Sequence, residues 1–210
     1  MFNLNMSIFN NISKYGLLAK LIHWLTAAGL LIQIPLGFYL VDLDFDQFRV
    51  DIENYHILFG LILFYTTLIR LTFKLLSPTP NFNDNAFPGQ KVLAKLNHFF
   101  LYLALLTITI SGIFKKLFNG ESLVIFFKKV NLTYNFELSE QFYSIHVLAN
   151  YVLIGLIALH ILAVLFHKFL LRENILKRIL YFLIIKCTSK TNIDCIKVRG
   201  FILSSINTGL

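Results

Sequence analysis

Charged side chains are scarce in this chain of 210 residues, where Asp, Glu, Lys and Arg together make up only 14%. Soluble domains carry about a quarter charged residues, so this shortage argues against an ordinary soluble fold. Hydrophobic residues instead make up 57% of the chain, and the mean hydropathy is +0.69. We therefore expect an integral membrane protein whose length suits one bundle of four or five spans.

Cysteine is nearly absent, and both copies, Cys187 and Cys195, lie near the C-terminus. Their spacing matches no zinc or thioredoxin-type motif, so we interpret them as unpaired thiols in a reducing compartment. The N-terminus lacks the charged start, short apolar core and cleavage site of a signal peptide, so the first span should act as an uncleaved anchor. The net charge of +8 is typical of cytoplasmic loops in a membrane protein, and nucleic acid is not an expected partner.

Four long apolar runs are present, and each is long enough to cross a hydrocarbon layer of about 30 Å as a helix. They cover residues 15–41, 55–76, 92–114 and 141–168. The sequence predicts an all-α integral membrane protein, a four-helix transmembrane bundle over residues 1–180, followed by an unassigned basic C-terminal tail over 181–210. The apolar patch SLVIFF at 122–127 is too short to span.

The distribution of Lys and Arg predicts the orientation of the bundle, because cytoplasmic loops carry an excess of both. The side that holds the two termini carries more of them, although Lys115, Lys116, Lys128 and Lys129 lie on the opposite side. We expect both termini of this multi-pass protein to be cytoplasmic.

Histidines recur inside these runs, where ionisable groups are costly and usually functional. His146 and His160 are 14 residues apart in the fourth run, which separates them by about 21 Å and leaves them within about 40° on one helix face. With the predicted orientation, His56 and His146 lie at an outer level. His23, His98 and His160 lie at an inner level, and His167 lies at the inner edge as an interfacial or supporting residue.

Paired imidazoles at one depth are typical of a low-spin haem b, which takes two axial ligands. The outer level offers one pair, whereas the inner level offers three histidines and leaves the pair open. Arg70, 14 residues after His56, would lie at the inner level and could pair with haem propionates. Gly37, Gly60 and Gly112 stand in register with the histidines, where they could leave room for a macrocycle or permit close helix packing.

Several segments of the chain resemble prokaryotic cytochrome b561 over about residues 13–180. They are AKLIHW (19–24), NYHILFG (54–60), RLTFKLLSPTP (70–80), LNHFFLYL (96–103) and the stretch 145–179. The resemblance implies two b haems, with His56 and His146 as ligands of the outer haem and His23 and His160 as ligands of the inner one. For His98 it implies a position near the haem, beside the propionates or a quinone, and not an axial ligand. Lys95 departs from the pattern, where close relatives have a further histidine.

The resemblance also implies electron transfer between a periplasmic donor and the membrane quinone pool, with ubiquinone as acceptor. Some members oxidise superoxide, so the chain would be a superoxide:quinone oxidoreductase or otherwise an electron carrier. The lysines of the outer side could attract a small anion, although the acids between residues 42 and 53 oppose them. An alternative is a cytochrome b anchor subunit that passes electrons from a bound dehydrogenase or hydrogenase to quinone. A haem-free transporter finds little support, because the chain lacks broken helices and repeats.

Overall fold

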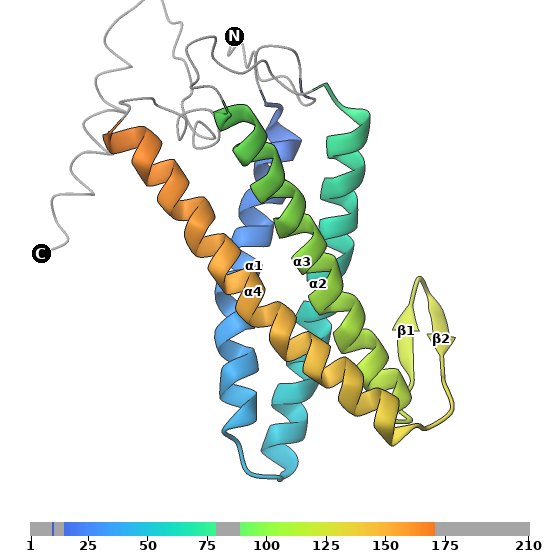
Figure 1. Ribbon diagram of the computed structural model, residues 1–210. Coiled ribbons are helices and arrows are strands. Elements are labelled where there is room, and N and C mark those ends of the chain that lie inside the picture. Colours follow the sequence, from blue (N-terminus) through green and yellow to red (C-terminus); the bar gives the residue numbers. More distant parts are fainter. Residues whose placement is uncertain (1–9, 11–14, 79–88, 171–210) are drawn as a thin grey trace, which may run out of the picture.

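The computed structural model describes residue 10 and residues 15–78 and 89–170. It contains four helices and one two-stranded hairpin (Figure 1): α1 (Leu17–Val41), α2 (Gln47–Leu76), α3 (Gln90–Phe118), β1 (Leu123–Ile125), β2 (Lys128–Val130) and α4 (Phe136–Phe169). All four helices are long and apolar enough to cross a membrane, which confirms the predicted four-helix transmembrane bundle. The predicted tail at 181–210, with both cysteines, lies outside the described residues.

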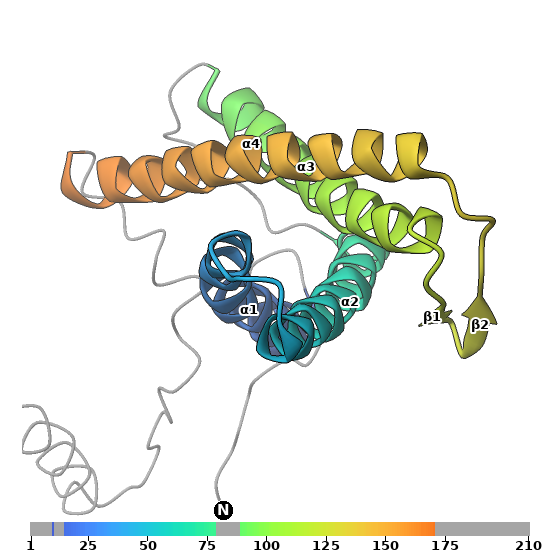
Figure 2. The same cartoon turned by 90° about the horizontal axis from the view of Figure 1, so that it is seen from below.

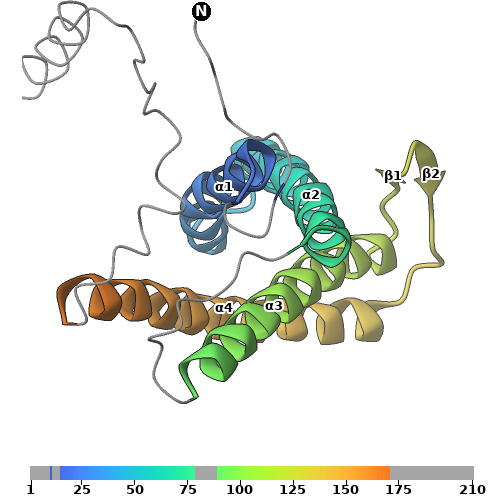
Figure 3. The same cartoon turned by 90° about the horizontal axis from the view of Figure 1, so that it is seen from above.

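The helices follow one another around the bundle, with α1 beside α2, α2 against α3, and α3 packed on α4 (Figures 2 and 3). The start of α1 and the end of α4 lie together at one end, called here the terminus end (Figure 1). The α1–α2 connection and the β1–β2 hairpin lie at the opposite end, called here the hairpin end. The hairpin end corresponds to the predicted outer level, and the terminus end to the inner level.

Helices α2 and α4 begin before their apolar runs because polar residues cap them. The Asp46 Oδ1 atom accepts a hydrogen bond of 2.8 Å from the backbone N–H of Arg49, so α2 begins eight residues before its apolar run. The Asn135 side chain caps α4 in the same way, by accepting from the N–H of Leu138. Hydropathy therefore predicted the membrane-spanning part of each helix, and the caps set the true beginnings.

The buried core is small and lies where α1, α3 and α4 meet. Leu153 is fully buried against Ala104 and Leu105, and Leu30 packs on this cluster from α1. Most other large apolar side chains of the described residues point outward, as membrane helices require, because lipid covers them. The bundle is thus built to contact a lipid bilayer on its outer surface.

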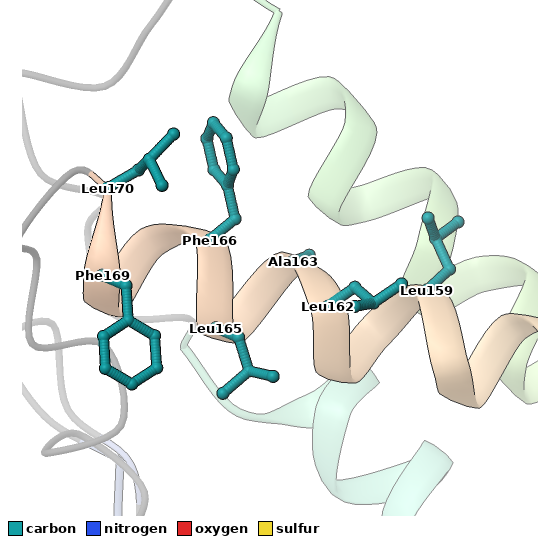
Figure 4. Close-up of a pocket in the computed structure, with 7 residues that line it drawn as sticks. All are labelled: Leu159, Leu162, Ala163, Leu165, Phe166, Phe169 and Leu170. Atoms are coloured by element: carbon teal, nitrogen blue, oxygen red, sulfur yellow. The ribbon is translucent and has the colours of Figure 1, made fainter.

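A shallow apolar pocket lies on the last turns of α4 at the terminus end (Figure 4). Its lining consists of Leu159, Leu162, Ala163, Leu165, Phe166, Phe169 and Leu170. No side chain in this set can donate or accept a hydrogen bond or hold a charge. The pocket is therefore part of the lipid-facing surface, and the chemistry of the molecule lies elsewhere, among the histidines inside the bundle.

Candidate functional site

The hairpin end brings together the two histidines predicted to pair there. His56 of α2 and His146 of α4 have ring centres 6.2 Å apart and ring planes inclined by 71°. Two imidazoles that hold one metal ion from opposite sides, through bonds of about 2 Å, have ring centres about 6 Å apart. The spacing of this pair therefore fits a single six-coordinate iron between the rings.

A hydrogen bond fixes the orientation of the His146 ring. Its Nδ1 lies 2.7 Å from the carbonyl oxygen of Ile108 on α3. Because a carbonyl can only accept, this nitrogen carries the proton, and Nε2 keeps the lone pair that binds a metal. Gly112, one helical turn after Ile108, opens the approach, since a Cβ there would lie 3.0 Å from the ring of His146.

Between α1 and α2, a side chain also reaches a helix carbonyl beside a glycine. The Gln33 side-chain nitrogen donates 2.8 Å to the backbone carbonyl of His56, one turn before Gly60. A Cβ at Gly60 would meet this amide at 3.3 Å. Both glycines thus expose a helix carbonyl to a side chain of the neighbouring helix. Gly60 therefore clears the approach of Gln33 in the described structure.

Gly37 faces the other ring of the hairpin-end pair. A Cβ at this position would lie 3.1 Å from Cε1 of His56. The Nδ1 atom of His56 is buried and has no hydrogen-bond partner among the described residues. Gly37 and Gly112 thus lie against the two rings and leave room for the imidazoles. The residues at the hairpin end fit a haem held by two histidines.

The terminus end gathers the three histidines predicted at the inner level, with His23, His98 and His160 within electrostatic range of one another. The rings of His98 and His160 lie closest, with centres 5.3 Å apart. His23 instead contacts Arg70, whose Nη2 lies 2.8 Å from Nδ1 of the imidazole. The guanidinium also stands over the ring of Tyr102 at 5.4 Å.

The hydrogen bonds give these rings different tautomers. Arg70 can only donate, so the Nδ1 of His23 accepts and its proton lies on Nε2. The Nδ1 of His98 lies 2.7 Å from the carbonyl of Ala94 and is therefore protonated, which leaves Nε2 free. For His23 to bind iron through Nε2, Arg70 must turn away from it. A haem propionate is a suitable new partner for that guanidinium.

Two polar residues of the site, Gln33 and Asn97, were not among the residues predicted from the sequence, which were histidines, Arg70 and glycines. Gln33 binds the backbone of His56, and the amide of Asn97 lies 3.4 Å from Nδ1 of His160. Asn97 is buried, and its Oδ1 has no partner among the described residues. A flipped amide would direct this oxygen at His160 and fix the ring for metal binding. The available signal was a lone amide inside an apolar run, where polar groups seek a partner.

Ion pairs neutralise much of the charge at the hairpin end. Lys116 is buried and bonds to Glu53 at 2.9 Å and to Glu121 at 2.6 Å, while Lys115 lies 3.6 Å from Glu53. Lys128 and Lys129 on β2 form no ion pair within the described part of the chain. The four lysines predicted to attract an anion are therefore divided into two that are paired with glutamates and two on the hairpin.

Sequence comparison places this arrangement among known proteins. Residues 14–181 match the family described as prokaryotic cytochrome b561. The chain belongs to the prokaryotic cytochrome b561 family. A relative named cytochrome b561 homolog 2, from Escherichia coli (strain K12), is 29% identical over 122 residues, which cover 58% of this chain and 65% of the relative. The chain thus aligns with less than two thirds of that relative's length.

Family membership and the four spanning helices together define the general class of the protein. It is a multi-pass membrane cytochrome of the b type, from a family of electron-transfer proteins that typically bind haem b. The predicted family and fold are confirmed. The axial ligands, the number of haems, the donor and the quinone remain predictions.

Proposed function

We propose that the bundle holds two b haems and transfers electrons across the membrane between a donor at the hairpin end and a quinone. The observation that carries this proposal is the His56–His146 pair, with ring centres 6.2 Å apart. When bound, the haems supply reversible one-electron chemistry. His146 is held for iron binding by the carbonyl of Ile108, and the helices exclude water from the site.

At the terminus end we assign His23 and His160 as the second ligand pair, as the family resemblance implies. The His98–His160 separation of 5.3 Å is shorter than two rings on one iron require. Arg70 would then bind propionate, and His98 would lie beside the propionates or the quinone. His98 is the competing ligand for this iron, because its free Nε2 already suits a metal.

The two sites would share α4, because His146 and His160 are separated by 14 residues, or about 21 Å along the helix. We infer that both termini are cytoplasmic and that the protein lies in the bacterial inner membrane. The hairpin end would then face the periplasmic donor. A quinone such as ubiquinone would receive the electrons, and two electrons with two protons convert it to the quinol.

Superoxide is the most specific candidate donor, since it would lose one electron and leave as O₂. Only Lys128 and Lys129 of the four lysines lack a glutamate partner among the described residues, so they would have to attract the anion. The alternative is a cytochrome b anchor subunit that receives electrons from a bound dehydrogenase or hydrogenase. Copurification with a peripheral redox enzyme would favour this alternative over a small-molecule donor.

The direct test is a reduced-minus-oxidised spectrum of the purified protein, together with haem quantification per chain. We expect b-type absorption bands and two haems per chain. A protein without such bands would overturn the proposal, and one haem per chain would remove the two-site pathway. Superoxide consumption with added quinone, at the rate of a buffer control, would exclude superoxide as the donor.

A further inference from the structure

The β1–β2 hairpin has an unusual turn. Its two strands are joined by Phe126 and Phe127, which have φ angles of 48° and 63°. Two-residue turns of this kind normally use Asn and Gly, because bulky side chains are strained at positive φ. The chain nevertheless presents two aromatic rings at the tip. Such strain often marks a segment with a role beyond chain reversal.

The tip does not extend away from the bundle. The hairpin turns back along α2 (Figure 1), and the N–H of Phe126 donates 2.9 Å to the hydroxyl of Tyr65. The Phe126 ring also packs at 5.4 Å from the ring of Tyr65 and at 6.4 Å from that of Phe64. Both partners lie in the middle of the apolar part of α2, so the contact fixes the depth of the tip.

That level lies within the apolar part of α2. Tyr65 is ten residues after Tyr55, where the apolar run of α2 begins, which corresponds to about 15 Å along the helix. Helix side chains lean toward the N-terminus, so the Tyr65 hydroxyl lies nearer to the start of this run than its backbone does. Because the open edges of a two-stranded hairpin are costly in hydrocarbon, the strands belong at the membrane interface, and only the tip can reach the acyl chains.

The outward side of the hairpin has the composition of a membrane interface. Phe127 is fully exposed, Val124 is 62% exposed, and Leu123 alone faces the protein as a buried residue. Lys129 lies on this outward face opposite Val124, whereas Lys128 directly follows the tip on the face of Leu123, and both lysines are exposed. Aromatic rings concentrate at membrane interfaces, and lysines near them extend their amino groups toward lipid phosphates.

We propose that the β1–β2 hairpin is a lipid-binding wedge in the leaflet at the hairpin end. Phe127 inserts among the upper acyl chains, and Lys128 and Lys129 bind the phosphate groups of anionic lipids. Tyr65 holds the wedge against α2 at a set depth. This interaction does not involve the haem ligands, and lysines that bind lipid phosphate would not be available to attract superoxide.

Spin labelling of the full-length chain in vesicles tests the wedge. In a background with Cys187→Ser and Cys195→Ser, a nitroxide is attached at Phe127→Cys, with Asp44→Cys as the water reference and Leu148→Cys as the lipid reference. Both reference positions are exposed, in the α1–α2 connection and on the middle of α4. The haem spectrum of each variant verifies the fold.

We expect the label at position 127 to behave like that at 148, with strong relaxation by oxygen and weak relaxation by a water-soluble nickel chelate. Nickel accessibility equal to that at position 44 would overturn the proposal. So would low accessibility to both reagents, because protein rather than lipid would then cover the tip.

The lysines are tested with the same label. The double change Lys128→Gln and Lys129→Gln should raise nickel accessibility at position 127 several-fold in vesicles containing phosphatidylglycerol, and much less in purely zwitterionic vesicles. Lys95→Gln is the matched control, because this exposed lysine lies on α3 near the terminus end. Equal effects in the two kinds of vesicle would disprove the binding of anionic lipids by these lysines.

Discussion

The two histidine levels of the bundle are organised differently. At the hairpin end, two histidines face each other with glycines beside both rings, and the Ile108 carbonyl holds one ring. At the terminus end, three histidines share the space, and the side chain of Arg70 occupies the Nδ1 of His23. Under the proposed function, the first level would hold iron without losing a hydrogen bond. The second would have to exchange hydrogen bonds when a haem with its propionates binds.

The difference follows from which group forms a hydrogen bond with the Nδ1 atom of each imidazole. A backbone carbonyl keeps its position, so the tautomer of His146 is set by the fold of α3. An arginine side chain is long and can donate either to an imidazole or to a carboxylate. The tautomer of His23 therefore depends on whether a carboxylate is bound beside Arg70. We therefore expect the hairpin-end haem to be lost only through its own residues, and the terminus-end haem to respond to a wider set.

The largest expected effect comes from His146→Ala, which removes an axial ligand at the level with no replacement histidine. Haem content should fall from two to one per chain, while the remaining haem keeps its spectrum. Pyridine haemochrome quantification with a redox titration measures this. His167→Ala is the control, because His167 contacts Gln90 at the edge of the bundle and should retain both haems. Two haems in the His146 variant would contradict the assigned pair.

The next comparison separates the two candidate ligands at the terminus end. We expect His23→Ala to reduce haem content to one per chain and His98→Ala to keep both haems, with a shifted potential for one of them. The reason is that the family resemblance assigns His23, and the rings of His98 and His160 lie 5.3 Å apart, closer than the 6.2 Å of the hairpin-end pair. The reverse result would make His98 the ligand, and His23 would then be the partner of Arg70 in the loaded protein.

A glycine exchange should produce a smaller effect, limited to the hairpin end. In Gly112→Ala the new methyl group would lie 3.0 Å from the His146 ring. Overpacking of this kind costs about 1–3 kcal/mol, which corresponds to a loss of about 5- to 150-fold in haem affinity. Gly155→Ala on α4 is the matched control, because nothing lies within 4 Å of its added Cβ.

Haem titration of the reconstituted protein compares the two variants. We expect weaker binding at one site in the Gly112 variant and unchanged binding at both sites in the Gly155 variant. If the titration were unaltered in both variants, the close contact of His146 with the Ile108 carbonyl would not be needed for haem binding.

Sequence patterns predicted the four helices and the depth of each histidine, because both depend on helix rise and on the cost of polar groups in lipid. They did not predict the Ile108 and Gln33 contacts, since these depend on how neighbouring helices are rotated. The glycine register was predicted, but at Gly60 and Gly112 its cause is a helix carbonyl one turn away, which a neighbouring side chain approaches. The hairpin was missed because Phe126 and Phe127 lack the turn residues by which hairpins are recognised.

The smallest expected effect concerns the ion pairs at the hairpin end. Lys116→Met would leave Glu53 with only the longer contact to Lys115 and Glu121 with only the hydrogen bond that it accepts from Asn119. Because both glutamates are partly exposed, we expect a loss of about 1 kcal/mol, or a fall in Tm of a few degrees. Thermal unfolding in detergent, followed by circular dichroism, measures it.

Lys115→Met, which removes only the 3.6 Å contact, should change Tm less, and both variants should keep two haems. If Lys116→Met also emptied the hairpin-end site, the ion pairs would be part of haem binding, and the two levels would both depend on side-chain charges.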